Sequence, residues 1–119
     1  MKHNAQERII QELVPGKEIT VAHLIASPDQ DLFDNLGLGN KLAYSKAAIG
    51  IISMTPAETV IIAADVANKA AGVKLGFVDR VRGSLLFQGN VSEVETALQA
   101  ICTYVEEKMD FSVCKITKT

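Results

Sequence analysis

The stretch A-I-G-I-I-S-M-T-P-A-E-T-V-I-I-A-A-D-V-A-N-K-A-A-G (residues 48–72) decides the fold. Its first seven residues, 48–54, form an apolar run rich in β-branched side chains, which predicts a buried strand. Thr55-Pro56-Ala57-Glu58 then matches a helix-start signature, in which proline fits the first turn. The small and aliphatic residues that follow predict a helix to about Ala71, and Gly72 ends it. The stretch therefore predicts a strand that leads directly into a helix.

Downstream of this unit, the same alternation continues to the end of the sequence. Residues 73–79 and 84–89 predict two strands of a hairpin around the turn 80–83. A capping box at 92–95 begins an amphipathic helix, and residues 111–117 predict a final strand. From residue 48 onward the order is β-α-β-β-α-β. That order predicts a ferredoxin-like α+β fold, with an antiparallel sheet and its helices on one face.

Upstream of residue 48, the pattern is less regular. Residues 7–14 fit either a strand or a helix, and Pro15-Gly16 ends that element as a turn. Residues 19–26 predict a strand, and Ser27-Pro28-Asp29-Gln30 predicts a capped helix that Gly37 terminates. Two predicted strands, 19–26 and 111–117, compete to pair with 48–54. The sequence leaves open which of them does so.

Composition and charge exclude some classes of function. The chain has 119 residues, which is typical of one domain, and 48% of them are hydrophobic with no Trp. The core must therefore consist of small aliphatic side chains. A net charge of −2 argues against a general nucleic-acid binder. A polar N-terminus and apolar runs no longer than Val60 to Ala64 argue against a membrane anchor.

Residues that could support chemistry are few and scattered. His23 lies in a predicted strand without a second nearby histidine, so we interpret it as a structural or interface residue rather than a ligand or general base. Cys102 and Cys114 have neither metal nor redox spacing, and we interpret them as reduced, buried thiols. Gly37-Leu38-Gly39 lacks the features of a dinucleotide loop. No catalytic set, metal site or cofactor is predicted.

Two charged features remain. Asp65 and Lys69 are four residues apart on the predicted helix, in the order that favours an ion pair. Arg80 and Arg82 form a basic turn with Gly83 and Ser84. This turn is either a solvent-facing hairpin or an anion-contacting or pore-lining loop, whose guanidinium groups and amides act as donors.

The residues of the central stretch and the hairpin resemble a known family. The strand 47–55, the helix signature Ala63-Ala64-Asp65 with Lys69-Ala70-Ala71, and the helix start Gly89-Asn90-Val91 are similar to those of bacterial microcompartment shell (BMC) domains. In the common form of that family, a strand and short helix of the type H-x-I-x-x-P-x-x-x-L close the domain.

Here that element comes first, as His23-Leu24-Ile25, Pro28 and Leu32. The order resembles the circularly permuted subfamily, typified by small shell proteins of ethanolamine- and propanediol-utilisation microcompartments. Residues 7–17 and the ending 114–119 are similar to that subfamily as well. The resemblance spans nearly the whole chain.

The resemblance implies a structural subunit and not an enzyme, with no cofactor. It implies residues 1–17 as an N-terminal barrel strand and turn, and residues 18–119 as the permuted shell domain. Six copies would form a disc that tiles with other shell proteins in the shell of a microcompartment in the bacterial cytoplasm. The compartment would break down ethanolamine or a related amine or diol, and the disc would contact encapsulated enzymes.

The resemblance also implies roles for particular residues. Lys69 would contact neighbouring discs at the disc edge. The other residues would lie on the disc axis, as the pore lining (Val81, Arg82, Gly83 and Ser84) and as a small barrel strand that caps the pore (Ile9, Gln11 and Leu13). Arg82 departs from the small or polar residue of many relatives, and six arginines around one axis would favour anions.

Two other hypotheses compete with the shell subunit. In the first, the chain is a small regulatory domain, and Arg80 and Arg82 bind an anionic metabolite, because a ferredoxin-like fold hosts many functions. In the second, it is a metal or iron–sulfur carrier within a shell. That hypothesis requires Cys or His at the pore turn, and residues 79–85 contain neither.

Overall fold

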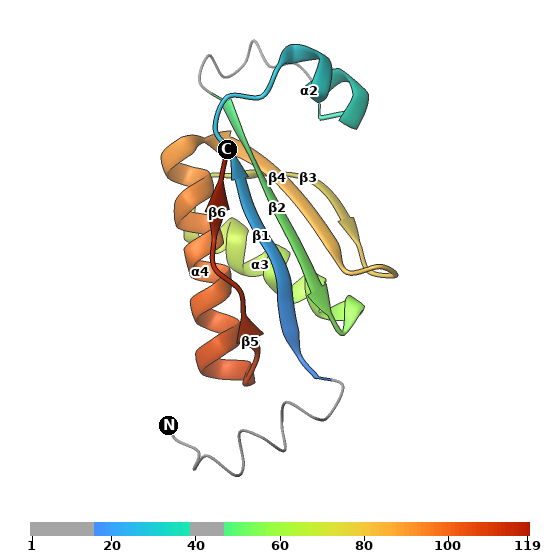
Figure 1. Cartoon of the computed structure of the whole chain (residues 1–119), viewed down its shortest axis with the longest axis vertical. Coiled ribbons are helices and arrows are strands. Elements are labelled where there is room, and N and C mark those ends of the chain that lie inside the picture. Colours follow the sequence, from blue (N-terminus) through green and yellow to red (C-terminus); the bar gives the residue numbers. More distant parts are fainter. Residues whose placement is uncertain (1–15, 39–46) are drawn as a thin grey trace.

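The sheet is the centre of the fold (Figure 1). The computed structural model describes residues 16–38 and 47–119, and within them six strands form one sheet. Strand β2 lies in the middle, between β1 and β4, and β3 forms one edge beyond β4. These pairs are antiparallel, as predicted. The strands are β1 (Glu18–Ile25), β2 (Ala47–Thr55), β3 (Lys74–Asp79), β4 (Ser84–Asn90), β5 (Ser112–Val113) and β6 (Thr117–Lys118).

The pairing that the sequence left open is resolved. Strand β1 pairs directly with β2, and the C-terminal residues pair in parallel with the other edge of β1. The two predicted strands therefore do not compete, because the strand predicted at 19–26 is β1 itself, and the C-terminal residues pair with the edge of β1 that β2 leaves free. From β2 onward, the observed order is β-α-β-β-α followed by two short strands, which confirms the predicted succession up to the end of the second helix.

The predicted final strand, 111–117, is wrong in one respect, because it is two short strands. Ser112 lies opposite Glu18 and Lys118 lies opposite Leu24, so β5 and β6 keep one register along β1. Strand β1 has an irregularity between Ile19 and Val21 in its pairing with β2. A bulge bends a strand and increases its twist, and the parallel ladder is interrupted over the same part of β1.

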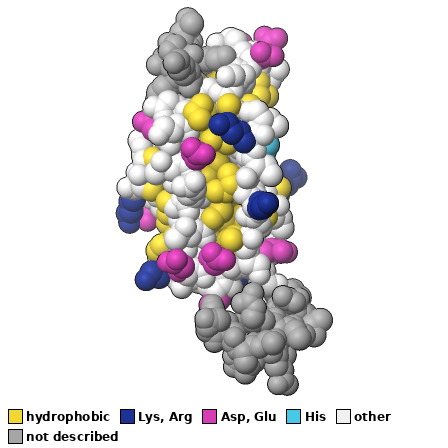
Figure 2. Space-filling model, turned by 60° about the vertical axis from the view of Figure 1, so that its left-hand side comes forward, with side chains coloured by type: hydrophobic (Ala, Val, Ile, Leu, Met, Phe, Trp, Pro, Cys, Tyr) yellow, Lys and Arg dark blue, Asp and Glu magenta, His cyan; other side chains and the backbone are white. Residues whose placement is uncertain are grey.

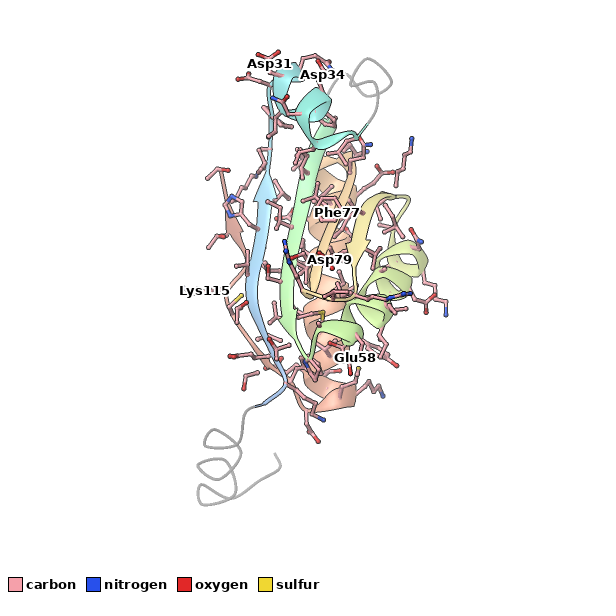
Figure 3. The ribbon with its side chains drawn as sticks, turned by 90° about the vertical axis from the view of Figure 1, so that its right-hand side faces the viewer. Asp31, Asp34, Glu58, Phe77, Asp79 and Lys115 are labelled. Carbon is pink, nitrogen blue, oxygen red and sulfur yellow. The ribbon has the colours of Figure 1, made fainter. Side chains whose placement is uncertain are left out.

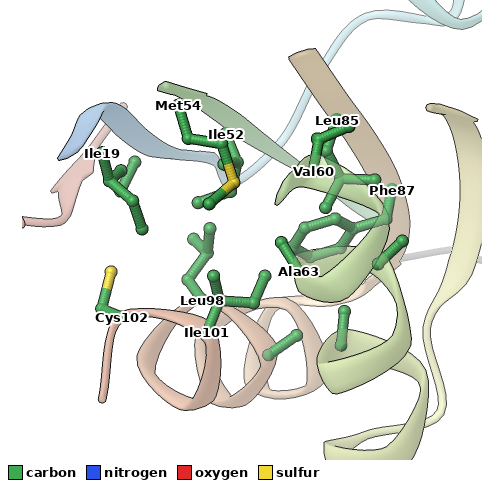
Figure 4. Close-up of a cluster of buried hydrophobic side chains, with 14 of the residues drawn as sticks. Ile19, Ile52, Met54, Val60, Ala63, Leu85, Phe87, Leu98, Ile101 and Cys102 are labelled. Atoms are coloured by element: carbon green, nitrogen blue, oxygen red, sulfur yellow. The ribbon is translucent and has the colours of Figure 1, made fainter. Parts of the chain in front are cut away.

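Two long helices cover one face of the sheet, as predicted. They are α3 (Val60–Ala70) and α4 (Val91–Met109). Alternate residues of the strands, such as Ile52 and Met54 of β2 and Phe87 of β4, point toward these helices and form the main core with them (Figure 4). The core is mainly aliphatic, with Phe87 and Phe111 as its aromatic residues and Met54 and Cys102 as its sulfur-containing ones, in agreement with the composition.

The short helix α2 (Gln30–Leu36) corrects the prediction of helices on one face only. Phe33 of this helix is fully buried in a second cluster with Leu38, Ile49 and Leu86. Ile49 lies between residues of β2 that face the main core, so α2 packs on the opposite face. It covers one end of that face (Figure 3), and no other helix of residues 16–38 and 47–119 packs there.

The helix starts also differ from the predicted capping boxes. Helix α2 has Asp29 at its N-cap without a side-chain bond, and α3 begins only after a 3-10 helix, η2 (Ala57–Thr59). The capping box of α4 is formed by Asn90 and Glu93, two residues earlier than predicted. Asn90 ends β4, so its backbone is already extended, as an N-cap requires.

The surface along α4 is only partly polar. Figure 2 shows a strip of apolar side chains there, with acidic and basic side chains on both sides. Val113, Cys114 and Ile116 of the C-terminal segment pack against the main core but remain partly exposed. Among the described residues, no helix is long and apolar enough to cross a membrane.

Candidate functional site

The predicted pore turn is the hairpin turn between β3 and β4, and one carboxylate organises it. Oδ1 of Asp79 accepts hydrogen bonds from the backbone N–H groups of Val81 and Arg82, both at 3.0 Å. These bonds, from Arg82 first and then Val81, hold the pKa of the Asp79 carboxyl below its usual value. The carboxylate therefore fixes the turn most firmly when it is ionised. Asp79 lies at the end of β3, beyond Phe77 (Figure 3).

The other end of the turn is fixed by Gly83. Its N–H donates to the carbonyl of Asp79 at 2.8 Å, and its carbonyl accepts from the N–H of Met54 at 2.9 Å. Its φ is +79°, a left-handed conformation that glycine adopts without strain. A Cβ at this position would lie 2.2 Å from the carbonyl oxygen of Met54 and 3.1 Å from Cα of Ala57. The turn is therefore held against the end of β2 and the start of η2.

The side chains of the turn point outward while its backbone is fixed. Val81 is 79% exposed, and Arg80 and Arg82 are exposed as well. Within residues 16–38 and 47–119 the structure records one ion pair, Asp65–Lys69, so neither guanidinium is paired there. Such a turn can present two guanidinium groups to an anion or to a neighbouring protein.

Exposed apolar side chains are concentrated near this turn. Large apolar residues seldom remain exposed without a partner when they form a contiguous patch. Of the seven large apolar side chains that are exposed in the described residues, five come from the start of α3, from β3 or from the turn. They are Ile61, Ile62, Phe77, Val78 and Val81. This end of the molecule is therefore suited to contact with another protein.

Lys69, the predicted edge residue, lies near the C-terminal end of α3. Its Nζ is 2.8 Å from Oδ2 of Asp65, and both side chains are largely exposed, so the predicted ion pair is present. The hydrogen bond and the charge of Asp65 raise the pKa of Lys69. Ala57 at the start of η2 lies next to Gly83, and α3 follows η2 directly in the chain. The 11 residues of α3 span about 16 Å. Lys69 and the turn therefore lie at opposite ends of α3.

The remaining predicted residues fall into two groups. Ile9, Gln11 and Leu13 lie outside the described residues. His23 is structural, as predicted: its ring nitrogens lie within hydrogen-bonding distance of Oγ1 of Thr117 and, at 2.9 Å, of Oγ1 of Thr119. It thereby holds β6 against β1.

Both cysteines are free thiols, but the prediction that both are buried is wrong for Cys114, which is only partly buried at the edge of the core. Cys102 is buried, and burial raises its pKa to about 11, with smaller contributions from Cys114 and Glu106. It is therefore protonated and unreactive near neutral pH. Among the described residues, no group of three or more His, Cys, Asp or Glu side chains could hold a metal ion.

Asp79 and Met54 hold the turn but are not among the residues predicted from the sequence. Asp79 could have been found, because aspartate at the first position of a turn often accepts hydrogen bonds from backbone N–H groups two or three residues later. Met54 acts through its backbone and lies 29 residues before Gly83, so no local pattern indicates its role.

Comparison with known proteins agrees with the geometry. The BMC domain model matches residues 48–117. The shell protein PduU of Salmonella typhimurium is 48% identical over 113 residues, which are 95% of this chain and 94% of that protein. The shell protein EutS of Escherichia coli is 44% identical over 114 residues, which are 96% of this chain and 98% of that protein.

A solved structure is similarly close. The flat hexamer of CutR aligns with a TM-score of 0.81 at 46% identity, over 94% of this chain and 99% of that one.

Proposed function

This chain belongs to the BMC domain family, and we propose that six copies of it close into a disc that builds the shell of a bacterial microcompartment. The observation that carries this proposal is the match to a flat hexamer over 94% of the chain. Ring closure would also cover apolar side chains that one copy leaves exposed near the turn.

The role that we assign is structural and not catalytic. The relatives PduU and EutS are both named as microcompartment shell proteins, and they match 95% and 96% of this chain at similar identity. The chain accordingly belongs in the shell, within the bacterial cytoplasm, together with other shell proteins and in contact with encapsulated enzymes. Since its relatives include both PduU and EutS, we propose an ethanolamine-degrading compartment or one for a related amine or diol.

We propose that the two ends of α3 mark the two radial limits of the disc. The turn of Val81, Arg82, Gly83 and Ser84 would surround the axis, and Lys69 would contact the next disc at the edge. The distance of about 16 Å along α3 supports this separation. Residues 1–17 would form a separate segment before the shell domain of residues 18–119. In that segment Ile9, Gln11 and Leu13 would line a small barrel strand over the pore.

A second function is favoured by one observation. Arg80 and Arg82 are exposed and unpaired within the described residues, as a regulatory domain that binds an anionic metabolite would require. Such a domain would bind its ligand as a monomer or dimer, whereas a shell subunit must form a ring.

The experiment that separates these functions is the mass of the purified protein in solution, measured by light scattering after gel filtration. One chain weighs 12.8 kDa, so a ring of six weighs about 77 kDa. We expect this mass over a wide range of concentrations. A monomer or dimer at high concentration would contradict the shell function and favour the regulatory one. An open helical assembly of increasing mass would support the subunit contact but contradict ring closure.

A further inference from the structure

We propose that Cys102 and Cys114 form a redox site, at which a low-molecular-weight disulfide oxidises the two thiols to a bond that joins α4 to the C-terminal segment, residues 111–119. Both thiols are free and belong to one chain, so the site depends neither on ring closure nor on the proposed function. It gives a chemical role to two side chains that a shell subunit does not otherwise use.

The two cysteines lie at the same end of the main core. Cys102 is buried on α4, and Figure 4 shows its sulfur pointing toward Ile19 of β1. Val113 of β5 is the partner of Ile19 in the sheet, and Cys114 follows Val113 and packs against the same core. A negative charge on Cys114 contributes to the raised pKa of Cys102, which agrees with thiols that are close in space. The fold therefore places both thiols around one side chain of β1.

The path of the C-terminal segment brings the two residues to a similar level along α4. The N–H of Phe111 donates to the carbonyl of Val105 at 3.0 Å, and the segment then runs back along α4 (Figure 1). Cys114 is three residues beyond Phe111, which is about 10 Å of extended chain. Cys102 is three residues before Val105, which is about 4.5 Å along the helix in the same direction. The two residues therefore differ in level by only about one helical turn.

The C-terminal segment is the partner that can adjust when the bond forms. A disulfide requires Cα atoms about 5.5–6 Å apart. Helix α4 has 19 residues and a capping box at its start, whereas β5 and β6 have two residues each. Cys114 lies between these two short strands, where no pairing with β1 is recorded in the described residues. It can therefore approach Cys102 without disturbing the helix.

Exposure decides the order of the two chemical steps. Cys114 is partly exposed, so its thiolate attacks the small disulfide, forms a mixed disulfide and expels one small thiolate. Cys102 is buried, and burial raises its pKa to about 11, with smaller contributions from Cys114 and Glu106. It does not meet the reagent in solution, but its thiolate attacks the sulfur of Cys114 in the mixed disulfide at high effective concentration and expels the second small thiolate. Each protein thiol loses one proton, each small thiolate takes one up, and the reagent accepts two electrons.

The bond should hold the start of the C-terminal segment more firmly. The N–H of Ser112 donates to the carbonyl of Lys17 at 3.0 Å, inside the loop that the bond would close. The N–H of Thr119 donates to the carbonyl of Leu24 at 2.9 Å, outside that loop. Because a closed loop restricts local opening, we expect hydrogen exchange at Ser112 to slow at least about tenfold and exchange at Thr119 to change much less. In a reducing compartment such a bond is transient, so the site would respond to a rise in small disulfides.

The test uses the full-length chain and dithiodipyridine, an aromatic disulfide whose released thiopyridone absorbs light, at one molecule per chain. We expect two thiopyridones per chain, the first released quickly and the second slowly. The second release should accelerate about tenfold per pH unit between about pH 7 and about pH 9, because the thiolate fraction of Cys102 rises by that factor below its pKa. The product should keep the mass of a single chain on a gel without reductant. Trypsin should then yield residues 83–108 linked to residues 109–115, since cleavage follows Arg82, Lys108 and Lys115.

Three variants sharpen the test. Cys102→Val keeps an apolar side chain in the core and should stop after one thiopyridone. Cys114→Ser should lose the fast release. The matched control is the double variant Cys114→Ser with Lys115→Cys, which keeps two thiols but moves the second to an exposed side chain. It should show the fast release and no second one, and circular dichroism should confirm that all three variants are folded.

The outcomes are decisive for the site and leave the shell function to its own test. One stable thiopyridone per chain would show that Cys102 does not reach the mixed disulfide and would overturn the inference. Covalent dimers on the gel, or no release at all, would also overturn it. A second release from the double variant as fast as that from the original protein would show that the position of Cys114 is not special. The mass of the ring under reducing conditions tests the shell function independently of all these results.

Discussion

The predicted contact residues lie in two regions, the hairpin turn and the end of α3. The two regions differ in whether their side chains are engaged in interactions within the chain. In the turn, backbone groups are fixed by Asp79 and by Met54, while the side chains are free. At the end of α3, the helix fixes the backbone, and Lys69 is engaged with Asp65 in an ion pair on the surface. Exposed ion pairs contribute little to stability.

The difference indicates where each region can tolerate change. A residue of the turn can alter its side chain without disturbing the fold, provided that the backbone anchors remain. Substitution of a residue that anchors the backbone should disrupt the turn, even though the side chain of that anchoring residue has no role in binding. At the end of α3, any effect of a substitution should appear in contacts between discs and not in the stability of the subunit.

The largest effect is expected for Gly83→Ala. The substitution places a Cβ 2.2 Å from the Met54 carbonyl oxygen at a positive φ, so the turn must move away from β2. We expect a loss of about 3 kcal/mol in the free energy of unfolding, measured by urea denaturation. Gly37→Ala is the matched control, because Gly37 also has a positive φ but no atom within 4 Å of a Cβ, and it should cost about 1 kcal/mol. Equal losses would contradict the account of the turn.

A smaller effect that depends on pH is expected for Asp79→Ala. The folded pKa of Asp79 is lowered, so its contribution to stability is complete above the unfolded pKa and is lost as pH falls through the folded pKa. The variant should unfold at lower urea concentration than the original protein at about pH 7, and the difference should shrink below about pH 3.9. Asp79→Asn keeps an acceptor and should lie between the two at neutral pH. A difference that stays constant down to low pH would show that ionisation of Asp79 has no part in holding the turn.

The smallest effect on the subunit is expected for Lys69→Ala. The substitution removes an exposed ion pair, so the urea midpoint should hardly change. The assembly of discs into sheets, followed by electron microscopy, should be impaired, because the proposed edge contact is lost. Asp65→Ala serves as the control, since it breaks the same ion pair but keeps the lysine. Normal sheets from Lys69→Ala would remove this residue from the disc edge.

Much of the fold could be predicted from the sequence because its signals are local. The apolar run 48–54, the small-residue helix and the hairpin between residues 73 and 89 each have a pattern that the structure retains. The place of the C-terminal residues could not be predicted. Their pairing with β1 joins residues 94 positions apart, and no local pattern specifies so distant a partner.

The candidate site was predictable in part. The basic turn and the ion pair of Asp65 and Lys69 follow from spacing, and both are present. The anchoring of the turn by the backbone of Met54 depends on tertiary contact and leaves no local pattern. The capping of α4 is local, but Asn90 with Glu93 and Ser92 with Glu95 have the same capping-box spacing, so spacing alone does not choose between them.

The most direct test of the central claim is the distance between equivalent residues in the assembled ring. Nitroxide labels would be placed on cysteines at Val81 or at Lys69, in a background without Cys102 and Cys114, and measured by double electron–electron resonance. In a six-fold ring the distance between neighbouring labels equals their distance from the axis. We therefore expect the shortest distances for Val81 and distances roughly 15 Å longer for Lys69, as the length of α3 implies. Distances at Val81 equal to or longer than those at Lys69 would contradict the placement of the turn at the axis.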